Sequence, residues 1–300
     1  MRIASLIPSG TDIAASLGLQ NNLVGRSHAC DHPAARDLPI LTRSLLPPDL
    51  PPAEIDAAVR AALKEGDGSL YITNREMLHA VRPDVVLTQS ICDVCAVNAR
   101  RAAEVLPAGA QMVTLGATGF TSLWEDLRQV AGVTGTNAEP LIADCKRRLD
   151  DIHQTVKNLQ HPRVLVLEWT DPPFLGGHWV PEMVAAAGGI PVPDWQGQVS
   201  RQVPWDEISA HDPDVIVIAP CGYSLEETRK LGEELLAQSI FKNLRAVKKN
   251  AVWVTDATHH YSRCTPACVR GVEVLAQTLF PKSTFSSALQ KPLKLEIDRL

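Results

Sequence analysis

Short apolar runs alternate with longer amphipathic segments along the chain, and this alternation predicts its secondary structure. Apolar runs rich in β-branched residues are typical of strands, and apolar positions three and four residues apart are typical of helices. The predicted strands are residues 2–7, 23–27, 84–88, 112–115, 163–169, 214–219 and 251–255. The predicted helices are residues 11–17, 53–64, 75–81, 98–106, 123–133, 139–159, 181–187 and 266–279. Strands and helices that alternate in this way predict an α/β fold with parallel sheets.

Two of these strands are almost wholly apolar. They are residues 84–88 (DVVLT) and 214–219 (DVIVIA), and strands buried on both faces of a parallel sheet have this composition. Each follows a helix and a proline, in Arg82-Pro83-Asp84 and in Asp212-Pro213-Asp214. The two halves of the chain are therefore expected to repeat one structural theme.

The turn after the first strand carries signals for the start and end of a helix. Ser9 and Asp12 have the spacing of a capping box for helix 11–17, in which each side chain would accept a backbone N–H. Gly18 is placed to end that helix, because glycine readily adopts the left-handed conformation. The segment 172–177 (PPFLGG) is expected to be a loop.

The helix 139–159 is long, polar and near the middle of the chain, which suits a connector between two lobes. We expect an N-terminal α/β lobe at residues 1–135, a bridging helix at 136–160 and a C-terminal α/β lobe at 161–280. Residues 281–300 are expected to form a polar tail.

The charge distribution narrows the classes of partner. The formal net charge is -5, and acidic and basic residues are interspersed, which argues against nucleic acid and against anionic membranes. No apolar run approaches the length of about 18 residues that a membrane span needs. The apolar N-terminal stretch MRIASLIP is shorter than the core of a secretion signal, so we expect a cytoplasmic location, or a periplasmic one if the sequence is a mature form.

The cysteines are the most distinctive candidate functional residues. All but Cys145 fall just after a predicted strand, where open α/β sheets bind their ligands; these are Cys30, Cys92, Cys95, Cys221, Cys264 and Cys268. In a reducing compartment such thiols favour metal, cluster or redox roles over disulfides. The alternative is that they are small buried apolar side chains.

The Cys92-x-x-Cys95 pair precedes a predicted helix, whose positive end would favour thiolate, which is both a nucleophile and a metal ligand. One interpretation is therefore a metal or iron–sulfur site in which Cys264 and Cys268 complete the ligand set, with Cys30 or Cys221 in reserve. Another is a thiol-dependent redox enzyme that uses Cys92 as its nucleophile. His259 follows the last strand and is a candidate ligand for cobalt or iron. No phosphate-binding loop of the Walker type and no nucleophile elbow is present in the sequence.

Several short motifs occur in an order that is characteristic of one family. They are residues 5–12 (SLIPSGTD), Val24-Gly25, residues 82–86 (RPDVV), residues 172–177, Ala187-Gly188-Gly189, residues 203–206 (VPWD), residues 244–254 and residues 271–276 (GVEVLA). This ordered set covers about 280 residues and resembles the vitamin B12-binding and iron–siderophore-binding proteins of ABC importers. The spacing from Val24 to Asp31-His32-Pro33 is most similar to the cobalamin branch.

The resemblance implies a fold, a function and partners. The fold would be two Rossmann-like α/β lobes joined by a long bridging helix, as in class III periplasmic binding proteins, also called helical backbone metal receptors. The function would be the binding of cobalamin, or another metal-containing tetrapyrrole or metal chelate, between the lobes, without enzymatic activity. The family hands its ligand to an ABC permease; without the family's secretion signal, the expected receiver is another protein that accepts the cargo.

The resemblance also implies which loops contact the ligand. The expected ligand-binding residues are Ser9, His28, Gln89, Trp169, Tyr223, Asp256 and Tyr261. The three aromatic residues would offer flat apolar area with polar tips to a corrin ring. Asp256 would accept hydrogen bonds from corrin amides.

Overall fold

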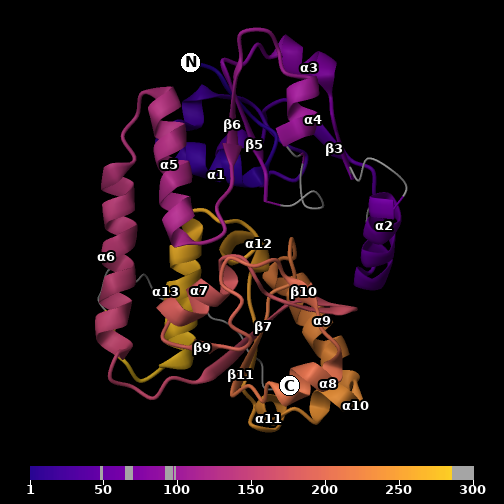
Figure 1. Cartoon of the computed structure of the whole chain (residues 1–300), viewed down its shortest axis with the longest axis vertical. Helices are drawn as coiled ribbons and strands as arrows, with labels where there is room; N and C mark the ends of the chain where they lie inside the picture. Colours follow the sequence, from indigo (N-terminus) through magenta and orange to yellow (C-terminus); the bar gives the residue numbers. More distant parts are fainter. Residues whose placement is uncertain (48–49, 65–69, 92–96, 98, 286–300) are drawn as a thin grey trace. The chain divides into compact units, whose positions relative to one another are not determined.

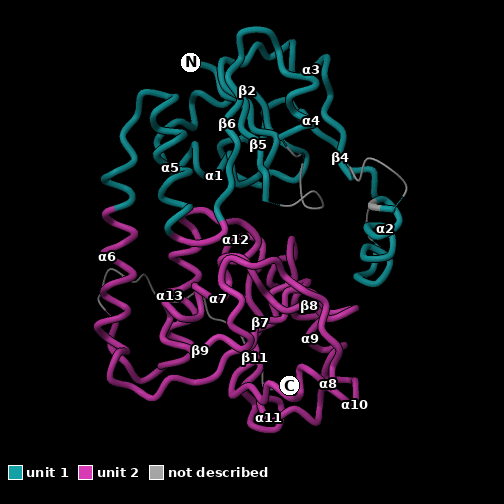
Figure 2. The backbone as a smooth tube through the Cα atoms, viewed as in Figure 1, with its two compact units in different colours: residues 1–117, 121–142 teal, residues 118–120, 143–300 magenta. Residues whose placement is uncertain are grey.

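The computed structural model describes residues 1–47, 50–64, 70–91, 97 and 99–285 (Figure 1). The chain folds into two compact units (Figure 2). Unit 1 comprises Met1–Ala117 and Thr121–Ile142, and unit 2 comprises Thr118–Phe120 and Ala143–Leu300. Helix α6 (Glu139–Val156) begins in unit 1 and ends in unit 2, so it links the two units in sequence, as the polar segment 139–159 predicts.

A parallel sheet of four strands lies in unit 1, in the order β2-β1-β5-β6. Its strands are β1 (Ile3–Ser5), β2 (Leu23–Gly25), β5 (Val85–Gln89) and β6 (Gln111–Leu115). All five residues of β5 are buried, which confirms the buried strand predicted at 84–88, one residue further along the chain. Because parallel strands run in one direction, the loops after these strands share one edge of the sheet, the carboxyl edge.

Helices and a small second sheet complete unit 1. The helices are α1 (Pro8–Ser16), α2 (Pro52–Lys64), α3 (Arg75–Ala80), α4 (Ala99–Glu104) and α5 (Phe120–Thr134), with short 3-10 turns at Gln20–Asn22 and Pro33–Ala35. Strands β3 (Thr42–Ser44) and β4 (Tyr71–Thr73) pair antiparallel. One core cluster packs Leu6, Leu41, Leu78 and Val86 together, each no more than 1% exposed.

Unit 2 contains a mixed sheet in the order β10-β8-β7-β11-β12. Strands β7 (Arg163–Thr170), β11 (Val215–Ile218) and β12 (Val252–Val254) are parallel, and β9 (Ile190–Pro191) pairs parallel with the start of β7. Strand β8 (Pro173–Leu175) runs antiparallel to β7, and β10 (Arg201–Gln202) antiparallel to β8. The helices are α7 (Val180–Ala186), α8 (Trp205–Ala210), α9 (Leu225–Ala237), α10 (Ser239–Lys242), α11 (Arg245–Lys248), α12 (Ala257–His260) and α13 (Ala267–Leu279).

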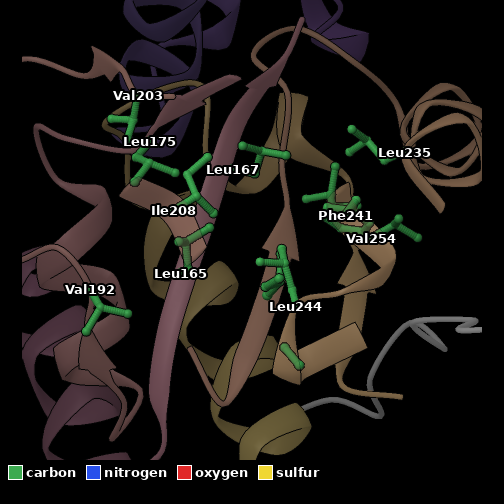
Figure 3. Close-up of a cluster of buried hydrophobic side chains, with 13 residues drawn as sticks. Leu165, Leu167, Leu175, Val192, Val203, Ile208, Leu235, Phe241, Leu244 and Val254 are labelled. Carbon is green, nitrogen blue, oxygen red and sulfur yellow. The ribbon is translucent and has the colours of Figure 1, made fainter. Parts of the chain in front are cut away.

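One core of unit 2 lies between this sheet and its helices (Figure 3). Leu165 and Leu167 of β7 and Val254 of β12 contribute from the sheet, and Leu235 of α9 and Phe241 of α10 contribute from the helices. Burial of apolar side chains of this size stabilises a fold by about 1.5–3 kcal/mol each. The core thus fixes the strands from which the loops of the carboxyl edge emerge.

The structure repeats one motif where the parallel strands of each unit begin, at the amino edge of each sheet. In unit 1 the Asp84 carboxylate accepts the backbone N–H of Arg2 at 2.7 Å, and in unit 2 the Asp214 carboxylate accepts that of Arg163 at 3.0 Å. Arg82 and Asp212, each followed by a proline, share a left-handed φ of 43°. The hydrogen bond from the backbone N–H of Arg163 lowers the pKa of Asp214, and the positive charge of Arg245 lowers it further. The predicted structural echo between the two halves is therefore confirmed.

Two local predictions are wrong. Helix α1 begins at Pro8 with Ile7 as its N-cap, so Ser9 and Asp12 lie inside the helix and form no capping box there. Proline at the first helical position has no N–H to satisfy and a φ already suited to the helix, which moves the start three residues earlier than predicted. The segment 172–177 is not all loop either, because its residues 173–175 pair with β7 as β8.

None of the helices in the described part of the chain is long and apolar enough to cross a membrane.

Candidate functional site

The carboxyl edge of the unit 2 sheet gathers most of the predicted ligand-binding residues that lie in this unit. Three segments form it: residues 168–172, which comprise the last residues of β7 and the turn to β8, residues 219–224 after β11, and residues 255–263 after β12. We call them the carboxyl-edge loops. Because their strands are parallel neighbours, the backbone places these loops side by side.

Trp169 and Tyr223 form an aromatic pair across two of these loops. Their ring centroids are 5.6 Å apart with the planes at 77°, an edge-to-face arrangement favoured by the ring quadrupoles. The Trp169 indole N–H donates to the carbonyl of Asp171 at 3.1 Å, which fixes its orientation. Both side chains are half-buried, so part of each remains accessible.

The Tyr223 hydroxyl is a hydrogen-bond donor at neutral pH. Burial raises the pKa of Tyr223, and the carboxylates of Glu227 and Glu234 raise it further. The phenol therefore keeps its proton and can donate to an acceptor on a ligand.

Asp256 and His259 form a second pair, on the loop after β12. Asp256 caps α12 by accepting the backbone N–H of His259 at 3.2 Å, and its other oxygen lies 2.8 Å from the Nδ1 atom of the same histidine. The neighbouring His260 is largely buried, which lowers its pKa and keeps it neutral. A carboxylate held in this way is a fixed acceptor at the edge of the sheet.

The carboxyl-edge loops carry more acids than bases. Apart from the histidines, their charged residues are Glu168, Asp171 and Asp256 against the single base Arg263. A surface of this composition favours neutral or cationic ligands that donate hydrogen bonds, and it disfavours ligands with several carboxylates.

Tyr261 is buried in the third of the carboxyl-edge loops. The residue is 3% exposed, and its backbone carbonyl accepts the indole N–H of Trp179 at 2.8 Å. Burial also raises the pKa of Tyr261, as expected for a phenol enclosed by protein. Its ring is enclosed by protein in this structure, and its contact with a ligand stays a prediction.

The predicted residues of unit 1 lie at three points along its carboxyl edge. Ser9 is in the first turn of α1, His28 follows β2, and Gln89 ends β5. Gln89 is 6% exposed, and its side-chain oxygen accepts the backbone N–H of Ile91 at 3.2 Å.

His28 is held in place by two neighbouring side chains. Its Nδ1 atom lies 2.8 Å from the hydroxyl of Thr42, and its ring packs on Tyr71 with centroids 5.4 Å apart. Burial lowers the pKa of His28, so the imidazole is neutral at pH 7. Its contact with a ligand stays a prediction.

Two of the described cysteines hold backbone carbonyls with their thiols. Cys268 donates its thiol to the Arg263 carbonyl at 2.9 Å, and Cys264 to the Gly119 carbonyl at 3.9 Å. Cys30 is buried and Cys221 is half-buried. Burial raises the pKa of the Cys145 thiol in α6 to about 11.

The predicted metal site requires several thiolate or imidazole ligands gathered in one place. Over residues 1–47, 50–64, 70–91, 97 and 99–285 there is no group of three or more His, Cys, Asp or Glu side chains that could hold a metal ion. Within that part of the chain, Cys30, Cys221, Cys264, Cys268 and His259 are therefore not assembled as metal ligands. Cys92 and Cys95 lie outside the described residues.

Asp126 is a buried carboxylate that the sequence reasoning missed. Located in α5, it accepts the backbone N–H groups of Gly116 and Ala117, at 3.0 and 2.9 Å, and so holds the loop after β6. Only its spacing of ten residues from Gly116 links the two in sequence, and no general pattern identifies that.

The pKa of Asp126 leads to a testable pH dependence. Burial raises the pKa of Asp126 from 3.8 to about 6, against the opposing effect of the two backbone N–H groups. The folded state therefore binds this proton more tightly than the unfolded state, so the stability that Asp126 contributes is complete below about pH 4 and is lost as pH rises through about 6. At about 1.36 kcal/mol per pKa unit, the loss is about 3 kcal/mol.

We expect urea unfolding of the wild-type protein between pH 4 and pH 7 to show this loss and Asp126→Asn to lack it. Carbon-13 NMR should place the midpoint of the Asp126 carboxyl near pH 6. Equal pH profiles for the two proteins would contradict the assignment.

Residues 3–258 match the model of a family described as periplasmic binding protein. A periplasmic heme binding protein from Pseudomonas aeruginosa has 20% identity and a TM-score of 0.71, with 95% of each chain covered. The periplasmic heme-binding protein RhuT from Roseiflexus sp. RS-1, in apo form, has 19% identity and a TM-score of 0.69, with 93% of this chain and 98% of that chain covered.

The periplasmic vitamin B12 binding protein BtuF of Vibrio cholerae has 20% identity and a TM-score of 0.66, with 93% of this chain and 96% of that chain covered. At these identities the likeness concerns the fold. No curated protein matches the sequence.

Proposed function

Because the family match spans residues 3–258 of 300, the chain belongs to the periplasmic binding protein family, and we propose that its ligand is cobalamin. Membership confirms the predicted resemblance and the α/β fold of two lobes with a bridging helix. The observation that carries the proposal is the half-buried aromatic pair, Trp169 and Tyr223, set among more acids than bases at the carboxyl edge of unit 2.

A corrin ring suits this surface for two reasons. Its flat apolar body can pack on the exposed part of the Trp169 and Tyr223 rings, which offer area at a small cost in side-chain entropy. Its periphery carries amide groups, whose N–H groups can donate hydrogen bonds to Asp256. The Asp256 carboxylate is already held in place as the cap of α12.

The charge of the same loops separates cobalamin from haem. Haem carries two carboxylates, and these would meet Glu168, Asp171 and Asp256 with Arg263 as the single non-histidine base of the carboxyl-edge loops. Like charges at close range cost free energy, and the cost grows as water is excluded. This balance favours an amide-bearing corrinoid, the ligand class named for the Vibrio cholerae neighbour, over the haem named for the other two.

Family membership also supports a binding role rather than catalysis. Binding proteins of ABC importers bind a small molecule and pass it to a permease, so we propose an ABC permease as the receiver of the cargo. Family membership also favours a periplasmic location of the protein over a cytoplasmic one. The iron–sulfur and thiol-enzyme alternatives draw no support from Cys264 and Cys268, whose thiols contact backbone carbonyls.

The test is a titration with two probes, cyanocobalamin and haemin, followed by absorbance and calorimetry. We expect saturable binding of cyanocobalamin with a Kd of about 1 μM or tighter, equivalent to about 8 kcal/mol. Haemin is expected to bind at least about tenfold more weakly, because its carboxylates meet the acidic loops. Tighter binding of haemin, or no saturable binding of cyanocobalamin, would overturn the proposal.

A further inference from the structure

Loop 219–224, which brings Tyr223 to the carboxyl edge, contains a conformationally permissive residue. Gly222 has a φ of +85°, in the left-handed region, and is exposed to solvent. A glycine samples more backbone conformations than any other residue, so the position of the loop depends on the contacts that hold it.

The Tyr223 N–H closes a turn around Gly222 by donating to the Pro220 carbonyl at 3.1 Å, and two further backbone hydrogen bonds tie the loop to neighbouring segments. The N–H of Cys221 donates to the carbonyl of Glu168 at 3.1 Å, which ties the loop to the end of β7. The N–H of Thr258 donates to the carbonyl of Tyr223 at 3.2 Å, which ties it to α12. A side-chain substitution leaves both of these bonds possible.

A further contact to this loop comes from a side chain. The Ser262 hydroxyl accepts the N–H of Gly222 at 3.0 Å and donates to the carbonyl of Ala257 at 2.9 Å. A serine hydroxyl has one proton, and because Ala257 takes it, a lone pair of the oxygen is directed at Gly222. One oxygen atom thus joins the loop after β11 to the loop after β12.

We propose that Ser262 is a positioning residue that holds the loop 219–224 in the shape in which Tyr223 contacts the ligand. This inference rests on the proposed function and identifies a residue outside the predicted site. Ser262 acts on the bound molecule through Gly222 and Tyr223. Holding the loop before binding reduces the conformational entropy that binding would otherwise cost.

The experiment compares Ser262→Ala with the wild-type protein in two measurements. Loss of one neutral hydrogen bond corresponds to a threefold to tenfold change in an equilibrium constant, to order of magnitude, so the Kd for cyanocobalamin should rise by about that factor. Without ligand, hydrogen exchange of the segment 219–224 should be faster by a similar factor. Ser262→Thr keeps the hydroxyl and should return both values to within about twofold of wild type.

Ser200→Ala is a matched control, because the Ser200 hydroxyl also accepts a glycine N–H in unit 2, that of Gly177 at 3.1 Å. It should leave exchange in 219–224 and the Kd for cyanocobalamin unchanged.

The outcomes separate the two proposals. If the wild-type protein does not bind cyanocobalamin, the proposed function fails and the exchange data alone judge Ser262. Unchanged exchange in Ser262→Ala overturns the positioning role, and so does an unchanged Kd in a wild-type protein that binds. A loss of affinity that Ser262→Thr does not restore also overturns it.

Discussion

Replacing Glu273 by alanine is expected to destabilise unit 2 by about 3 kcal/mol. Glu273, in α13, is 2% exposed and joins two arginines from different helices. One of its oxygens accepts from Nε of Arg148, in α6, at 2.6 Å, and the other accepts from Arg270 at 3.2 Å. Its removal takes a buried anion away from both arginines and leaves a cavity.

The size of the effect follows from burial. Breaking a buried ion pair by removing one partner costs about 3–5 kcal/mol, since the remaining charge loses its counterion in a poorly solvated place. Arg148 and Arg270 are 26% and 22% exposed, so they can turn partly towards water, which places the expected value at the lower end.

Urea unfolding followed by tryptophan fluorescence measures this directly. Five of the six tryptophans lie in unit 2, so the signal reports chiefly on that unit; these are Trp169, Trp179, Trp195, Trp205 and Trp253. Asp144→Ala is the control, because Asp144 pairs with Arg148 at 3.8 Å but is 48% exposed, and such pairs contribute less than about 1 kcal/mol. Equal losses in the two variants would show that burial of Glu273 has no energetic consequence.

The second large effect is expected from Trp169→Ala, on ligand affinity. Truncation of a central aromatic contact residue costs about 2 kcal/mol or more, which is about 30-fold in Kd. Trp169 offers its own ring and supports the edge of Tyr223 at 5.6 Å, so alanine removes one surface and loosens the other. Calorimetric titration with cyanocobalamin provides the measurement.

Two further variants test the interpretation. Trp169→Phe keeps an aromatic ring beside Tyr223 and should lose less affinity than alanine. Trp195→Phe is a matched change at a tryptophan of the same unit, whose ring lies 4.7 Å from the Arg201 guanidinium, and it should leave the Kd unchanged. A loss at Trp195 equal to that at Trp169 would mean that the affinity reflects the general stability of unit 2.

Much of the fold was predictable, because buried strands leave a strong local signal. The apolar runs 84–88 and 214–219 lie at β5 and β11, and each deviates from the prediction by about one residue at its ends. The helix N-caps were less predictable. The spacing Ser9-x-x-Asp12 predicted a box that does not form, whereas the same spacing in Ser224-x-x-Glu227 forms one, at the start of α9. Pro8 accounts for the difference, since it can begin a helix without a capping side chain.

The site was predictable by loop but not by side-chain direction. Trp169 and Tyr223 come together because their strands are neighbours, which the strand pattern implies. Tyr261 lies in an equally suitable loop but is buried, and the contact with Trp179 that accompanies its burial spans 82 residues. Ser262 bonds to a glycine 40 residues away, and no local pattern predicts such a partner.

Stabilisation of the strands and binding of the ligand are assigned to opposite edges of each sheet. Asp84 and Asp214 tie together the strand beginnings at one edge of each sheet, while the candidate ligand-binding loops leave from the opposite edge. Substitutions in those loops therefore leave the ties intact. Proteins with this fold can therefore evolve to bind a different ligand through substitutions in these loops, while the aspartate ties continue to stabilise the sheets.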